Sequence, residues 1–303
     1  MIRTGITGID EMLGSGIPKG TRVVFSLEPG VEGRMFMMRT IASALNEKKN
    51  VCILSPHCTE RVFFSESFEI LEIDITNLGG KAVILDSTVR ESINSCEKKG
   101  TSRKLAWKKL IEETLEQHSI DVFFVYFDLL YEDLGLMKAL DLLPTARERD
   151  RVTTVVEHLN LEGDSLISRF ASENIFDLII SIHSAFTLVP FFNFFTLEYV
   201  SWARIPRRSI PYTVAGRSIR LYIPKIIITG PPASGKSTFV SHASDSGISV
   251  DRGDLDGCRT TVAMDLGWLH FRGFDITIFG TPGQPRFDPI IPQLVKNAMG
   301  IIL

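Results

Sequence analysis

Apolar residues in the first two thirds of the chain form short uninterrupted runs, separated by longer amphipathic stretches. Six runs rich in Val, Ile and Phe predict β-strands over residues 21–27, 50–55, 81–86, 120–127, 151–158 and 176–182. Because these runs are apolar at successive rather than alternate positions, we expect strands that are buried on both faces. Helical patterns lie between them, for example over 35–49 and 102–117. This alternation predicts a parallel or mixed α/β sheet.

The pattern changes near residue 194. The stretches FFTLEYVSWARI (194–205) and SIRLYI (218–223), with a turn between them, predict an antiparallel end to the first sheet. A new apolar strand, KIIITG (225–230), then begins a second unit. We therefore predict two domains, which comprise residues 1–222 and residues 223–303.

Composition restricts the class of protein. A hydrophobic content of 44%, a charged content of 23% and a net charge of −3 are typical of a soluble globular chain. The charge balance gives no reason to expect binding to nucleic acid or to an anionic membrane. No apolar run approaches the ~18 residues that would span a bilayer, and the four cysteines show no paired spacing. We expect a cytoplasmic protein.

The stretch TGPPASGKST (229–238) fits the pattern G-x-x-x-x-G-K-[S/T], and it follows an apolar strand and precedes a helical segment. In this context backbone N–H groups wrap phosphates, the lysine reaches the β- and γ-phosphates, and the serine hydroxyl coordinates Mg²⁺. The motif thus predicts a site for a nucleotide with Mg²⁺ as cofactor. Its residues are Gly230, Ala233, Ser234, Gly235, Lys236, Ser237 and Thr238.

Two later segments bear on the choice of nucleotide. TTVAMDLG (260–267) and IFGTPGQPRF (278–287) stand where a small GTPase has its two switches. Here the chain resembles the Ras-like GTPases, and most closely their bacterial and archaeal branch related to MglA. The resemblance implies that Thr261 binds Mg²⁺ and senses the γ-phosphate, and that Gly283 donates its N–H to that phosphate. It further implies that Gln284 orients the attacking water, so that Lys236 and Gln284 are the expected catalytic residues.

The second switch departs from the family pattern, because Gly280 replaces the acid that usually holds Mg²⁺ through a water. We interpret this as a variant of a working switch, with Asp265 or Asp275 contributing from nearby. A switch that no longer works and a chance glycine-proline turn are the alternatives.

A further departure concerns the base of the nucleotide. The Asn-Lys-x-Asp segment that reads guanine in this family is not found before Leu303. We therefore expect residues 223–303 to be the first part of a GTPase domain within a longer chain. Guanine specificity is inferred from the switch segments alone.

The N-terminal stretch TGITGIDEMLGSGIPKG (4–20) resembles the opening of KaiC-type RecA-like ATPases, and the resemblance extends over residues 1–222. Several active-site positions do not follow it. Arg34 and Met35 stand where the family has Lys and Ser or Thr, and Tyr126 stands at the usual place of an acid, with Asp128 two residues later. The resemblance and these substitutions together imply a RecA-like fold that has lost its ATP chemistry.

The combined expectation is an α/β protein in which a RecA-like P-loop domain is followed by a partial P-loop GTPase domain. It would bind GTP and GDP and hydrolyse GTP slowly, because no arginine finger is evident. The first domain would serve as an assembly module, including for a homo-oligomer. The resemblance to MglA-type GTPases implies a roadblock-type activator as partner. The alternatives are a nucleotide-responsive scaffold that does not hydrolyse, and an ATPase that uses the second phosphate loop.

Overall fold

The computed structural model forms two compact units, Met1–Arg207 with Tyr212–Arg220 and Arg208–Pro211 with Leu221–Leu303. It describes the chain except for residues 15, 32, 56–57, 99–100, 145–151, 185–192, 222, 250–251, 256–257, 262–263, 272–273, 284–288, 290 and 297. No helix in the described ranges combines the length and apolar character needed to cross a membrane.

The first unit is built on a nine-stranded sheet with the order β3-β2-β4-β5-β1-β6-β7-β8-β9. Neighbouring strands from β3 to β6 are parallel, and β7 is antiparallel to β6. The prediction of a parallel or mixed sheet is therefore confirmed, and the sheet is mixed with a large parallel part. The strands are β1 (Arg22–Leu27), β2 (Val51–Leu54), β3 (Ala82–Leu85), β4 (Val122–Tyr126), β5 (Thr153–Leu159), β6 (Leu178–Ser184), β7 (Asn193–Val200), β8 (Ser209–Ala215) and β9 (Ser218–Leu221).

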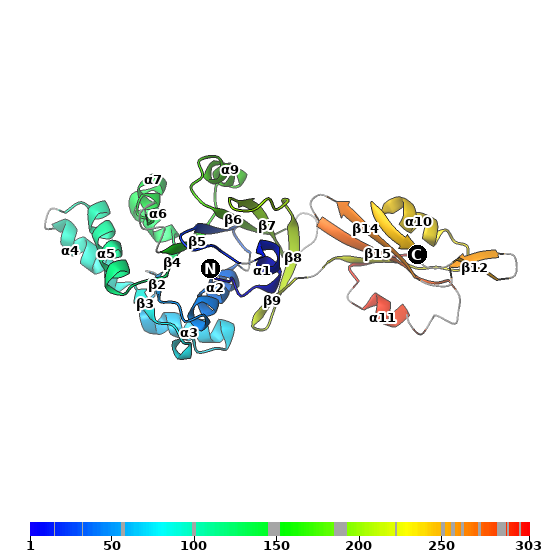
Figure 1. Cartoon of the computed structure of the whole chain (residues 1–303), viewed down its shortest axis with the longest axis horizontal. Coiled ribbons are helices and arrows are strands. Elements are labelled where there is room, and N and C mark those ends of the chain that lie inside the picture. Colours follow the sequence, from blue (N-terminus) through cyan, green and yellow to red (C-terminus); the bar gives the residue numbers. More distant parts are fainter. Residues whose placement is uncertain are drawn as a thin grey trace. The chain divides into compact units, whose positions relative to one another are not determined.

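Helices cover the two faces of this sheet, with α2 and α3 on one side and α6 and α9 on the other (Figure 1). On the second side, Val24, Phe123 and Ile179 of the strands pack in one core with Trp107 and Phe170 of the helices, all fully or almost fully buried. Burial on both faces explains the uninterrupted apolar runs. The helices are α1 (Thr7–Leu13), α2 (Arg34–Asn46), α3 (Glu60–Leu71), the 3₁₀ turn η1 (Ile75–Asn77), α4 (Thr88–Lys98), α5 (Arg103–Gln117), α6 (Asp128–Leu134), α7 (Leu136–Leu140) and α9 (Asp164–Ser172).

Strand β8 corrects the sequence-based expectation of a simple turn between the last two strands. Pro211 argues against a strand at this position, because proline cannot donate to the hydrogen-bond ladder. The Tyr212 side chain is nevertheless buried, and its ring packs 5.1 Å from that of Phe36 and 6.3 Å from that of Phe195. Burial of a large aromatic ring therefore outweighs the local signal of the proline.

The second unit contains a five-stranded sheet with the order β11-β14-β15-β10-β16 and a separate hairpin of β12 and β13. Strand β10 is parallel to β15 and β16, whereas β14 is antiparallel to both β15 and β11. A small core of Ile228, Val240 and Ile278 joins the sheet to α10. The elements are β10 (Lys225–Ile228), α10 (Lys236–Ala243), β11 (Ser246–Ser249), β12 (Arg252–Leu255), β13 (Cys258–Thr261), β14 (Asp265–Phe271), β15 (Phe274–Gly280), α11 (Ile291–Val295) and β16 (Gly300–Ile302).

The β14–β15 hairpin determines which segments meet in this unit. Asp265, the first residue of β14, pairs with Gly280, the last residue of β15, and Gly280 also pairs with Ile228 at the end of β10. The segment that precedes β14 and the segment that follows β15 therefore leave the sheet at one end. At that end β10 runs into the 229–235 loop.

Candidate functional site

The loop between β10 and α10 has the backbone of an anion-binding turn. Gly230 (φ 146°), Ala233 (φ 59°) and Gly235 (φ 88°) all have positive φ angles, which glycine adopts most easily. Gly235 is the N-cap of α10; it supplies no side-chain cap, and the first turn of the helix contains no acidic residue. The N–H groups and the positive dipole end of α10 therefore favour an anion at the loop.

Lys236, the first residue of α10, extends back across this loop. Its Nζ donates to the carbonyl oxygens of Gly230 at 2.9 Å and Pro231 at 2.6 Å, and to Ser234 Oγ at 3.3 Å. Burial lowers the pKa of Lys236, while the nearby charge of Asp265 acts in the opposite direction. A positive charge is thus held beside the N–H groups of the helix, so both attract the same anion.

A small cavity of about 130 Å³ lies beside α10, and Ser237 and Asp265 are among its lining residues. Asp265 is buried, with 4% of its surface exposed. A hydroxyl and a carboxylate are hard oxygen donors of the kind that Mg²⁺ prefers when phosphates and waters supply its other ligands. Within the described residues no group of three or more His, Cys, Asp or Glu side chains converges as it would on a metal held by protein alone. The residues present therefore fit Mg²⁺ bound together with a phosphate.

The segment after β15 lies directly against the phosphate loop. The Thr281 backbone N–H donates to the Ile228 carbonyl oxygen at 2.8 Å, and its hydroxyl donates to the Thr229 hydroxyl at 3.0 Å. A methyl group on Gly283 would lie 2.7 Å from Pro232 N and 2.8 Å from Lys236 Nζ. The backbone of Gly283 thus occupies a position that no other residue type can take without displacing the loop.

The structure brings many of the predicted nucleotide-site residues together. The loop contains Gly230, Ala233, Ser234 and Gly235, the start of α10 contains Lys236, Ser237 and Thr238, and Gly283 adjoins both. Thr261 is the last residue of β13, and its side chain lies outside the described part of the structure. Gln284 lies outside the described residues altogether.

The two acids considered as substitutes for the acid missing at position 280 differ in their placement. Asp275 pairs with His270 along the hairpin, and its carboxylate accepts a hydrogen bond from that ring at 2.9 Å. It is five residues from Gly280 along one strand, a distance of roughly 16 Å at the rise of a β-strand. Asp265 instead lies directly opposite Gly280. Only Asp265 is therefore near the loop.

The corresponding loop of the first unit has a different conformation. Gly33, the N-cap of α2, has φ −98° where Gly235 has φ 88°. A methyl group on Gly33 would lie 2.3 Å from Leu27 Cδ2, so the Leu27 side chain fills the space next to this glycine. The Glu28 carboxylate accepts a hydrogen bond from the Ser184 backbone N–H at 2.8 Å. These contacts fix the loop in a shape unlike that of residues 229–235.

The residues that replace the usual lysine and hydroxyl in this loop have other partners. Arg34 has a side chain that is 68% exposed and forms an ion pair with Glu66 at 3.7 Å. Met35 is buried in the core, with 5% of its surface exposed. One residue is thus on the surface and the other contributes to packing.

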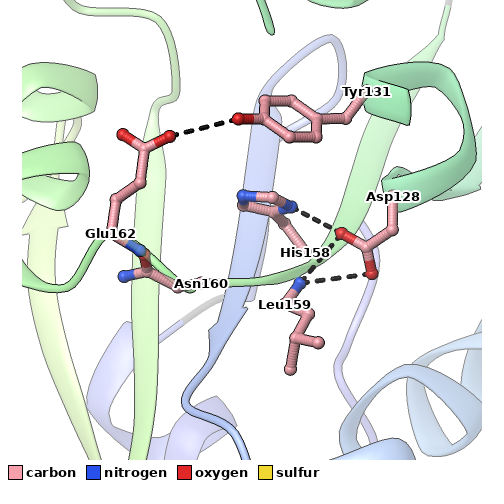
Figure 2. A network of polar contacts seen from close by, with 6 residues as sticks. All are labelled: Asp128, Tyr131, His158, Leu159, Asn160 and Glu162. Atoms are coloured by element: carbon pink, nitrogen blue, oxygen red, sulfur yellow. Dashed lines mark hydrogen bonds and ion pairs between the residues drawn. The ribbon is translucent and has the colours of Figure 1, made fainter. Parts of the chain in front are cut away.

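Asp128, at the start of α6, belongs to a polar network at the ends of β4 and β5 (Figure 2). Its Oδ1 accepts hydrogen bonds from His158 Nδ1 at 2.7 Å and from the Leu159 backbone N–H at 3.1 Å. A cavity of about 380 Å³ is lined by Asp128 and His158 and also by Tyr131 and Glu162, whose side chains are joined by a hydrogen bond of 3.2 Å. The carboxylate of Asp128 therefore anchors the end of β5 to α6.

Glu157 is an acid of the first unit that sequence reasoning did not single out. It pairs with Phe25 of β1 on one side and with Tyr126 of β4 on the other. Burial, and next the charge of Asp128, raise the pKa of Glu157 to about 8. Its position as the one acid in a run predicted to be a buried strand was the available signal.

Comparison with known proteins identifies the fold of the larger part of the chain. No protein-family model matches the sequence, and no curated protein matches it. Among solved structures, the chain is similar to the KaiC-like protein PH0186 from the hyperthermophilic archaeon Pyrococcus horikoshii OT3, with a TM-score of 0.54 and 16% sequence identity. The match covers 73% of this chain and 98% of that chain. At this identity the similarity shows the fold alone, which is the KaiC-like, RecA-type α/β fold predicted from the N-terminal sequence.

Proposed function

We propose that the second unit binds GTP and GDP with Mg²⁺ at the 229–238 loop and hydrolyses GTP slowly. The observation that supports this most strongly is the position of Gly283 against Pro232 and Lys236. A segment whose backbone touches the phosphate loop and its lysine can report whether a terminal phosphate is present. In this proposal residues 281–283 are the sensing segment.

The roles of individual residues follow from their positions. The N–H groups of the loop and of α10 bind the phosphates, and the Lys236 ammonium neutralises their charge. The N–H of Gly283 would donate to the γ-phosphate, and Gln284 would orient the attacking water. Ser237 and Thr261 would hold Mg²⁺, which when bound supplies further positive charge to the phosphates.

The hairpin topology supports two switches acting at one site. Thr261 lies shortly before Asp265 in the chain, and Gly283 lies shortly after Gly280. Because Asp265 and Gly280 pair with each other, the two segments leave the sheet at the end where the phosphate loop lies. Guanine rather than adenine is proposed because both segments resemble those of Ras-like GTPases.

We propose further that the first unit is a pseudo-ATPase that acts as an assembly module. The Leu27 side chain beside Gly33, the surface position of Arg34 and the burial of Met35 support this. Homo-oligomer formation through this unit and a roadblock-type activator of the second unit are the partners we propose.

Single-turnover hydrolysis of GTP and ATP, measured side by side on the full-length protein with Mg²⁺, tests this function. We expect slow release of phosphate from GTP and little from ATP. Faster turnover of ATP would instead indicate an ATPase. Tight binding of GTP with no release of phosphate would indicate a scaffold that responds to nucleotide without hydrolysing it.

A further inference from the structure

The acid that Ras-like switches have at the position of Gly280 is missing, yet a carboxylate lies in the same place. Asp265 and Gly280 are directly paired across the antiparallel strands β14 and β15. Directly opposed residues in such a pair have Cβ atoms about 4.5–5.5 Å apart. A short acidic side chain on either strand can therefore reach the same volume.

The environment of Gly280 shows that Asp265 fills this volume. A methyl group on Gly280 would lie 3.3 Å from Asp265 Oδ2 and 3.2 Å from Asp265 Cβ. It would also lie 3.2 Å from Val240 Cγ2 of α10. The glycine therefore leaves room for the Asp265 side chain, and a larger residue at 280 would compete with it.

Asp265 also lies close to the other groups of the candidate site. It lines the small cavity that Ser237 lines, at the start of α10. Its negative charge acts on the ammonium of Lys236. The carboxylate is thus almost fully buried near both the residue expected to bind Mg²⁺ and the residue expected to bind phosphate.

We propose that Asp265 holds Mg²⁺ in place of the acid missing at position 280, so that the acid has moved from β15 to the facing position of β14. This inference rests on the proposed function, because it assumes that Mg²⁺ binds with the nucleotide at this loop. The contribution of Asp265 to Mg²⁺ binding is greatest in the GDP complex. That complex lacks the γ-phosphate, which would itself be a ligand of Mg²⁺ and would be sensed by Thr261.

The proposal makes an uncommon prediction for position 280. Introducing the family's usual acid by Gly280→Asp would place two carboxylates within contact distance, against Val240. Like charges at this separation repel, and the added side chain has no space. The variant is therefore expected to bind Mg²⁺ no more tightly than the natural protein, although it restores the family pattern.

The test measures how Mg²⁺ slows the release of a fluorescent GDP analogue from the full-length protein, for Asp265→Asn and the control Asp275→Asn. We expect Asp265→Asn to raise the Mg²⁺ concentration that gives half of the maximal slowing by about 10- to 100-fold. This is the range found when a group supporting a metal site is removed. Asp275→Asn should leave it unchanged. An unchanged Mg²⁺ requirement in Asp265→Asn would overturn the proposal.

A double variant, Asp265→Gly with Gly280→Asp, returns the acid to the opposite strand and keeps the proposal testable if the single variant is unstable. It should recover most of the natural Mg²⁺ dependence, and failure to do so in a folded protein would count against Asp265. GDP affinity in EDTA separates the two proposals. Binding there by both the natural protein and the variants supports the nucleotide site, whereas no binding by the natural protein under any condition refutes the proposed function itself.

Discussion

The hydroxyl of Thr281 donates a hydrogen bond to the hydroxyl of Thr229 at 3.0 Å, just beyond the paired ends of the parallel strands β15 and β10. Thr281 is buried, with 2% of its surface exposed, and Thr229 begins the phosphate loop. The bond joins the segment expected to sense the γ-phosphate to the loop expected to bind it.

Replacing Thr281 with Val keeps the shape of the side chain and removes this hydrogen bond. We expect a loss of about 1 kcal/mol in the free energy of unfolding, because the Thr229 hydroxyl loses a partner. GTP hydrolysis should slow while GTP affinity changes little, since the segment is less well positioned but the loop is intact. Single-turnover kinetics and denaturant unfolding measure the two effects. Thr277→Val, in strand β15 shortly before Thr281, is the control, and equal effects of both variants would contradict this role.

Gly283 provides a second prediction. In Gly283→Ala the new methyl group would meet backbone atoms of Pro232, at 2.7 Å from its N and 2.9 Å from its Cα. One of the two segments must therefore move, and we expect GTP hydrolysis to fall by more than about tenfold, the scale of misplacing a group at a reacting centre. The matched control is Gly300→Ala, because a methyl group on Gly300 has no atom within 4 Å. Normal hydrolysis in Gly283→Ala would show that this contact has no role.

The first loop should remain inactive even when its sequence is repaired. In the double variant Arg34→Lys with Met35→Thr the motif regains its lysine and hydroxyl. The Leu27 side chain would still fill the space beside Gly33, and Glu28 would still be bonded to Ser184. We therefore expect no binding of ATP to this unit in a calorimetric titration of a protein that also has Lys236→Ala. Micromolar ATP affinity would show that the loop can still bind phosphate once the lysine and the hydroxyl are restored.

Glu157 predicts a pH dependence of stability. Its pKa in the folded protein is raised to about 8, above the ordinary value of 4.5. Between these values the folded state holds a proton that the unfolded state releases, so this group makes the protein less stable as pH rises, by at most about 1.4 kcal/mol per pH unit. Glu157→Gln removes the titration, and the variant should gain stability relative to the natural protein between pH 5.5 and pH 8. Urea unfolding at the two pH values measures this, and a constant difference between the proteins would contradict a raised pKa.

The sequence predicted the parts of the fold that depend on local pattern. The six strands with continuous apolar runs form the parallel part of the sheet, because burial on two faces leaves a clear signature. Strand β8 was missed, and a turn was predicted in its place. Pro211 is visible in the local sequence and argues against a strand, whereas the packing of Tyr212 against Phe36 and Phe195 joins residues far apart in the chain.

The candidate site was predictable to a similar extent. Lys236 and Ser237 follow from a motif that is contiguous in sequence, whereas choosing between Asp265 and Asp275 required the register of the β14–β15 hairpin. That register depends on how the two strands pair and on the turn between them, and no single contiguous motif contains it. The conformation of the loop around Gly33 was equally hidden, because it depends on where the Leu27 side chain packs.

The most direct test of the account compares the two loops in one experiment, a calorimetric titration of GTP with Mg²⁺ into Lys236→Ala and Arg34→Ala forms of the full-length protein. Lys236→Ala should weaken GTP binding by at least about 100-fold, because hydrogen bonds to charged groups contribute roughly 1.5–3 kcal/mol each. Arg34→Ala should bind GTP as the natural protein does. Loss of binding in Arg34→Ala with normal binding in Lys236→Ala would contradict the assignment of the nucleotide site to the second unit.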